Sequence, residues 1–337
     1  MPILPAPLLF ASERASKFAE FTVHPWQWGL FLGLIAVLIV ADLLLVHRTA
    51  HEITFKEAAI ESAVWITIGV SFTGVVFWWH GGQAAGEYIT GYLIEKSLSI
   101  DNVFVWAVIL SYFKVPARYQ FRVLFWGIFG ALVLRAMFIF GGVAVINRFE
   151  VTLVVFGMIL LYSAWKIAFH DDSEVDPEKS IVLRLFRRVI PSSTEYDGQK
   201  LFTKQNAKRV ATPLFAVLIM IETTDVLFAV DSIPAILAVA REQFIVFSSN
   251  AFAILGLRSL YFCLNGMQDR FRYLNVGLGF ILAFVGVKML LSYFFKAWFH
   301  DWVPTWSSLV FISLTLTVTI VASLRADKRD HHPVPAD

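Results

Sequence analysis

Apolar runs of about 20 residues, each long enough to cross roughly 30 Å of hydrocarbon as a helix, recur along almost the whole chain. The sequence is 58% hydrophobic and its mean hydropathy is +0.67. This is more apolar surface than one water-soluble core could bury. The sequence therefore predicts an all-α polytopic membrane protein.

The runs divide into nine expected transmembrane helices. Their approximate bounds are 26–46, 59–79, 88–113, 121–146, 151–169, 210–240, 244–267, 274–294 and 304–324. An odd number of spans puts the termini on opposite sides of the membrane, and lysine and arginine concentrate in cytoplasmic connections. These residues are abundant after helices one, three, five, seven and nine and scarce in the other connections. We therefore expect the N-terminus outside and the C-terminus in the cytoplasm.

The segments outside the repeated part of the chain have simple expected roles. Residues 1–25 are an N-terminal tail without a cleaved signal, and 26–86 form helices one and two. Residues 170–209 are a cytoplasmic connection, and 296–337 form helix nine with a disordered tail from residue 327. Within the connection, SIVLRLFRRVI is either a basic amphipathic helix on the anionic inner surface or a solvated linker.

Two parts of the chain, 87–169 and 210–295, resemble each other. The acids Glu95 and Asp101 align with Asp225 and Asp231 at the same spacing of six. In the helices that follow, the alignment sets Arg135 over Arg258 and Lys166 over Lys288. With three helices in each repeat (helices 3–5 and 6–8), the second copy must enter the membrane in the opposite orientation. Many transporters use this inverted plan, with a substrate site near the midplane.

The segment IETTDVLFAVDSIP places Glu222, Asp225 and Asp231 in an apolar run. A charged side chain near the bilayer centre costs about 2.5–3.5 kcal/mol on insertion scales, so these three require about 8–10 kcal/mol from partners, protons or bound cations. The segment EKSLSIDNVF carries a similar set. The candidate ligands from both segments are Glu95, Asp101, Asn102, Glu222, Asp225, Asp231 and Ser232.

These candidate ligands are hard oxygen donors, which suit Mn²⁺, Ca²⁺ or Mg²⁺. Soft-metal chemistry lacks ligands, because the single cysteine, Cys263, is in an apolar helix and the histidines fall at helix ends or in loops. Within the expected spans carboxylates outnumber cationic side chains, which favours a cationic over an anionic substrate. The alternative is that the acids only form ion pairs that fasten helices, with Arg135 and Arg258 as partners.

Helix geometry limits how these acids can share an ion. Residues six apart on a straight helix are about 120° and 9 Å apart, so Asp225 and Asp231 would not bind one ion directly. Pro234 removes the hydrogen bond to the carbonyl of Val230, and we expect the backbone near Asp231 to kink or unwind. Glu61, at the start of helix two, is expected at the membrane interface.

The motifs EKSLSIDNVF, IETTDVLFAVDSIPAI and SSNAFAILGLRSLYF, with the following LGFILAFVGVKML, resemble the TerC/Alx family of bacterial integral membrane proteins. The resemblance covers about 26–323. It implies an inner-membrane protein whose acidic-motif positions are the seven candidate ligands above, and Asp42 matches a first-helix aspartate less securely. The family was named for tellurium resistance, and similar members are implicated in manganese export, in some cases linked to alkaline pH.

The leading functional hypothesis is a divalent cation exporter, for Mn²⁺ before Ca²⁺ or Mg²⁺, that works by alternating access with protons as the counter-ion. The second is a scaffold without transport activity in a metal or tellurite stress-response or membrane-insertion complex. An enzyme is not expected, because no aspartyl-protease or nucleophile-elbow motif occurs. Tellurite transport is disfavoured because carboxylates repel anions. The expected partners are the cation and the bilayer, with no nucleic acid, and the sequence leaves the oligomeric state open.

Overall fold

The computed structural model describes most of the apolar part of the chain. The described residues are 18–19, 21–43, 53–149, 151–169, 191, 193, 195–205, 208–264, 273–295 and 305–330. The amphipathic segment discussed above, most of the N-terminal tail and the residues after 330 lie outside them.

The first two elements are α1 (Pro25–Ala41) and the long α2 (Phe55–Tyr112). Thr54 caps the start of α2, because its side chain accepts a hydrogen bond from the Glu57 amide. The helix is interrupted at Gly81, where φ is +83° and ψ is −177°. This backbone region is essentially restricted to glycine. The interruption divides α2 into two arms that match the second and third expected helices.

The other helices follow the apolar runs closely, and each of the nine expected segments overlaps a helix. They are α3 (Ala117–Arg148), α4 (Thr152–Phe169), α6 (Pro213–Leu237), α7 (Gln243–Leu255), α8 (Leu257–Leu264), α9 (Leu274–Phe294) and α11 (Thr305–Asp330). Four helical segments are long and apolar enough to cross a membrane, and four shorter apolar helices accompany them. This architecture agrees with a polytopic membrane protein.

The local structure differs from expectation at several places. Helix α6 continues through Asp231 and Pro234 and ends at Leu237, so the backbone does not unwind at the acid. The segment 244–267 instead breaks at Gly256, between α7 and α8, where a Cβ would crowd Trp65 and the Lys96 ammonium. The connection before α6 contains an antiparallel hairpin, and α11 remains helical as far as Asp330 instead of becoming a tail at 327. The hairpin strands are β1 (Phe202–Gln205) and β2 (Lys208–Ala211).

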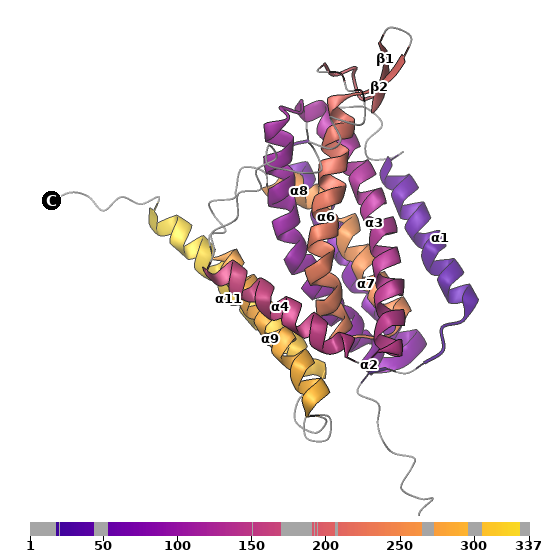
Figure 1. The fold of residues 1–337 in the computed structure, drawn as a ribbon, viewed down its shortest axis with the longest axis vertical. Helices are drawn as coiled ribbons and strands as arrows, with labels where there is room; N and C mark the ends of the chain where they lie inside the picture. Colours follow the sequence, from indigo (N-terminus) through magenta and orange to yellow (C-terminus); the bar gives the residue numbers. More distant parts are fainter. Residues whose placement is uncertain are drawn as a thin grey trace, which may run out of the picture.

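The described helices pack as a bundle around α7, whose residues from Phe244 to Leu255 are all buried. In Figure 1, α2, α3, α6 and α7 lie together, α1 lies at the right-hand edge, and α4, α9 and α11 form a group that leans away from the bundle. Large apolar side chains face outward, as on Trp78, which is 83% exposed. Outward apolar side chains of this kind suit contact with lipid.

Close contacts give the relative directions of the packed helices. Helix α4 runs antiparallel to α9, since Gly157 meets Leu290 and Gly279 approaches Ala164. Helix α3 runs parallel to α6, since Gly127 meets Ile221 near one end of the contact. Further toward the C-terminal end of both helices, Gly142 of α3 meets Leu237 of α6, so the two chains advance in the same direction.

The second arm of α2 has two such neighbours. It runs parallel to α7, because Gly91 meets Ser249 and the Lys96 ammonium donates to the Ala253 carbonyl at 3.2 Å. It runs antiparallel to α6, because Gly91 also meets Ile236 while Asn102, further along α2, contacts Asp225.

Candidate functional site

The guanidinium of Arg135, on α3, lies between carboxylates from two other helices. It forms an ion pair with Glu95 of α2 and a two-point contact with Asp225 of α6, through Nε to Oδ2 at 3.1 Å and Nη2 to Oδ1 at 2.9 Å. Each of these three side chains is at most 2% exposed. The planar guanidinium matches such paired contacts, and it joins three helices through one buried group.

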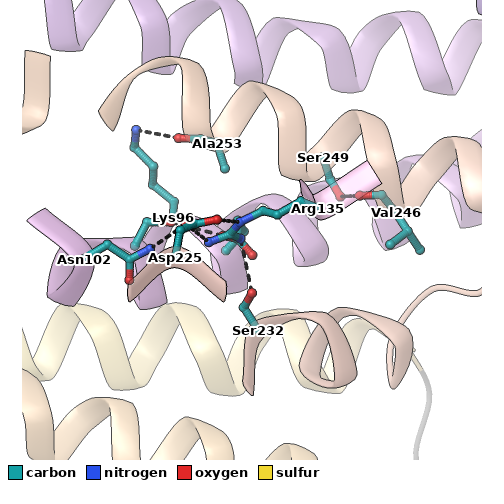
Figure 2. Close-up of polar contacts among 10 residues, drawn as sticks. Lys96, Asn102, Arg135, Asp225, Ser232, Val246, Ser249 and Ala253 are labelled. Atoms are coloured by element: carbon teal, nitrogen blue, oxygen red, sulfur yellow. Dashed lines mark hydrogen bonds and ion pairs between the residues drawn. The ribbon is translucent and has the colours of Figure 1, made fainter. Parts of the chain in front are cut away.

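Two further candidate ligands contact this cluster. Ser232 accepts a hydrogen bond from Arg135 Nη1 at 3.2 Å, and the Asn102 amide nitrogen donates to Asp225 at 3.4 Å (Figure 2). Ser99, one turn after Glu95 on α2, donates to the Glu95 carboxylate at 3.2 Å. The structure therefore brings Glu95 and Asn102 from the first acidic motif together with Asp225 and Ser232 from the second.

Asp231 lies next to this cluster with a different partner. Its carboxylate accepts a hydrogen bond from the Ser163 hydroxyl of α4 at 2.7 Å. Asp225 and Asp231 thus face different helices, as their spacing of six on a continuous helix predicts. Sequence reasoning missed Ser163, although a hydroxyl in the apolar run LLYSAWK, shortly before Lys166, was an available signal.

A small cavity lies among these side chains. Its volume is about 50 Å³, and its lining combines four candidate ligands and Arg135 with four apolar side chains. The lining residues are Glu95, Leu98, Asn102, Arg135, Ile167, Phe228, Asp231, Ser232 and Leu282. A single water needs roughly 10–15 Å³ by such a measure, so the cavity has room for a few waters or one partly hydrated ion.

Three buried oxygens of the candidate ligands have no hydrogen-bond partner among the described residues. They are Glu95 Oε2, Asn102 Oδ1 and Glu222 Oε2. Glu95 and Asn102 both line the cavity. Glu222 instead contacts Gly130 of α3, where its carboxylate takes the space that a Cβ would need. Because an unpaired buried acceptor costs about 1–3 kcal/mol, these oxygens mark places where a cation or water would be stabilised.

The structure does not bring Asp42 to this cluster, although the family resemblance included it among the candidate ligands. The Asp42 carboxylate accepts a hydrogen bond from Arg258 at 2.5 Å, and Glu61 binds the same guanidinium nitrogen at 2.7 Å. Both carboxylates are 9% exposed, so they are buried within the protein. Arg258 also lies over the Phe121 ring, 4.1 Å from its centre. This group is a separate buried ion-pair cluster.

Among the described side chains, no set of three or more histidine, cysteine, aspartate or glutamate residues is arranged as a metal site. The side chain of Asp101 lies outside the described part, although its backbone belongs to α2. Lys96, next to Glu95 in sequence, points away from the cluster and contacts Ala253 (Figure 2). The described oxygen ligands are therefore held together by Arg135, with the cavity beside it.

Comparison with known proteins gives a consistent result. Residues 80–331 match the model of the integral membrane protein TerC family. An "Uncharacterized membrane protein STKORF319" from Myxococcus xanthus is 47% identical, over 89% of this chain and 92% of that protein. The "Putative membrane-bound redox modulator Alx" of Escherichia coli K12 is 43% identical, over 90% and 97%. No solved structure matches. The chain therefore belongs to the TerC family of integral membrane proteins.

Proposed function

We propose that this chain exports a divalent cation, Mn²⁺ before Ca²⁺ or Mg²⁺, by alternating access around the cavity described above. The observation that carries the proposal is the lining of that cavity. Oxygen ligands from both acidic motifs converge on it, and two of its buried oxygens, Glu95 Oε2 and Asn102 Oδ1, have no partner among the described residues. Carboxylate, amide and hydroxyl oxygens are ligands that hard divalent cations prefer.

The helix directions support an inverted repeat. In the alignment, the second arm of α2 corresponds to α6, α3 to α7, and α4 to α9. The contact of α2 with α7 therefore corresponds to that of α6 with α3, and both pairs run parallel. The two pairs of equivalent helices, α4 with α9 and α2 with α6, run antiparallel. A pseudo-twofold axis in the membrane plane would produce this pattern, with the site near the axis.

The proposal includes nine membrane passes in the bacterial inner membrane, with the N-terminus outside and the C-terminus in the cytoplasm. Protons serve as the counter-ion, since carboxylates that release a metal outside can carry protons back. The two parallel and two antiparallel pairs fit helices that alternate in direction along the chain.

The direct test measures Mn²⁺ flux in proteoliposomes, with an imposed pH gradient and with Ca²⁺ and Mg²⁺ as competitors. We expect Asp231→Asn to reduce flux at least tenfold, because it removes a negative charge from the cavity lining but keeps the size of the side chain. Asp197→Asn is the control, because Asp197 is a 41% exposed acid in the connection before α6. Normal flux in the Asp231 variant would show that the site is assigned wrongly.

The scaffold hypothesis is supported by a different observation: Arg135 and Arg258 each bind two carboxylates from other helices. If the acids only fasten helices, wild-type protein in liposomes moves no divalent cation, and Asp231→Asn lowers thermal stability without a transport defect. A redox role, suggested by the names of some relatives, could not use an intramolecular disulfide, because the chain has one cysteine.

A further inference from the structure

Arg135 occupies the point where the two repeats present equivalent acids. Glu95 and Asp225 align with each other in the two repeats, and the Arg135 guanidinium binds both. It also donates to Ser232, a third candidate ligand. Arg258, which aligns with Arg135, instead binds Asp42 and Glu61. The central position is therefore held by one cation that belongs to the protein itself.

A divalent ion at this position would need the same oxygens. Mn²⁺ and similar cations gather about six oxygen ligands in a compact shell. In the structure both Asp225 oxygens and one Glu95 oxygen are already directed at guanidinium nitrogens. A carboxylate whose oxygens accept hydrogen bonds from a guanidinium cannot also coordinate a metal with the same lone pairs. Metal and guanidinium therefore compete for these carboxylates.

We propose that Arg135 is a tethered counter-ion that occupies the Glu95 and Asp225 carboxylates in the cargo-free protein and is displaced when a divalent cation binds. This inference rests on the proposed export function and adds a mechanism of release to it. When the cation leaves, the guanidinium returns to the two carboxylates, so the buried acids are never left without a positive charge.

The geometry gives the guanidinium a place to move. It lines the cavity of about 50 Å³ together with Asn102 and Asp231. The Asp231 carboxylate accepts its hydrogen bond from Ser163, which belongs to α4 and not to the helices that carry the Arg135 cluster. A shift of Arg135 toward Asp231 would free the Glu95 and Asp225 oxygens while the arginine stays paired.

The test separates cation affinity from turnover. Arg135→Gln removes the competing charge, so we expect the KM for Mn²⁺ in proteoliposomes to fall at least tenfold. We also expect the maximal export rate to fall at least tenfold, because nothing displaces the bound cation. The Kd for Mn²⁺, measured by titration calorimetry on purified protein, should fall in parallel with KM. Arg258→Gln is the matched control, since it removes the aligned buried guanidinium from two acids outside the cavity, and its KM should stay within twofold of wild type.

A purely structural role for Arg135 gives a different result, namely a reduced rate with an unchanged or raised KM and Kd, and this result would overturn the inference. If Arg135→Gln does not fold, Arg135→Lys is measured instead. Lysine keeps the charge but cannot make the two-point contact with Asp225. The Kd of the Arg135→Lys variant for Mn²⁺ should therefore fall several-fold, and an unchanged Kd would equally overturn the inference. Wild-type protein that neither binds nor transports Mn²⁺ would refute the export function itself, which is a separate outcome.

Discussion

Arg258 shows how single side chains decide which helices are joined. It is 2% exposed and binds Asp42 at the end of α1 and Glu61 in the first arm of α2. Removing one member of a buried ion pair leaves a charge without compensation, whereas replacing all the members together is often nearly neutral.

We expect Arg258→Gln to lower the free energy of unfolding by about 3–5 kcal/mol. The combination of Arg258→Met, Asp42→Asn and Glu61→Gln should recover most of this loss, because no uncompensated charge remains. Thermal or denaturant unfolding of purified protein in detergent would measure both. A combined variant that is less stable than the single variant would contradict this account of the cluster.

The sequence could indicate that these charges are paired but could not identify the pairs. The acidic motifs and the two aligned arginines are visible in the chain, and the structure does join Glu95, Asn102, Asp225 and Ser232. The partners of Arg258 come from helices outside the repeats. Pairing between side chains this distant in sequence depends on which helices pack together, which a local pattern does not contain.

The contact between α3 and α6 depends on glycines on the face of α3. Gly130 leaves the space that the Glu222 carboxylate takes, whereas a Cβ added at Gly141, on the same helix, would meet no described atom within 4 Å. Both positions have a helical backbone, but only Gly130 is in close contact with another described helix. They therefore form a matched pair for testing the contact.

We expect Gly130→Ala to destabilise the protein by about 1–3 kcal/mol, because the methyl group must displace Glu222 or separate the helices. Gly141→Ala should be neutral or stabilising by up to about 1 kcal/mol, since alanine favours the helix. Melting temperatures in detergent would distinguish them. Equal effects at the two positions would mean that α3 and α6 are not in close contact here.

The junction between the two arms of α2 depends on the backbone of Gly81. Because its φ of +83° and ψ of −177° are costly for any other residue, Gly81→Ala should cost about 1–3 kcal/mol. Gly82→Ala is the control, because a Cβ there would meet only Phe77, at 3.7 Å, among the described residues. The same unfolding measurements apply. If Gly81→Ala is tolerated as well as the control, α2 does not need this conformation.

The arrangement of the whole chain in the membrane can be tested by labelling. In a Cys263→Ser background, Gln83→Cys places a thiol at an exposed position just after Gly81, where the two arms of α2 meet, and Lys200→Cys places one in the connection before α6. A maleimide that cannot cross membranes should label Gln83→Cys in spheroplasts, and Lys200→Cys only after the membrane is permeabilised. The reverse pattern would invert the proposed orientation.

The sequence by itself determined where the helices lie and which side chains are chemically unusual. Each apolar run is a local property of the chain. About 20 apolar residues can span the bilayer as a helix, because a helix pairs all their backbone N–H and C=O groups within the segment. The acids in these runs are conspicuous for the same reason, since an unpaired charge is costly in lipid. These features require no knowledge of which helices are neighbours.

Only the tertiary structure decided how these helices and charges are used. It placed Arg135 between Glu95 and Asp225, gave Asp231 a partner in Ser163, and assigned Asp42 to Arg258. It also kept α6 helical past Pro234 and put the break at Gly256. The physical reason is that these outcomes depend on contacts between helices, where the close approach of Trp65 and Lys96 requires the small glycine. Such contacts arise only when the helices are packed together.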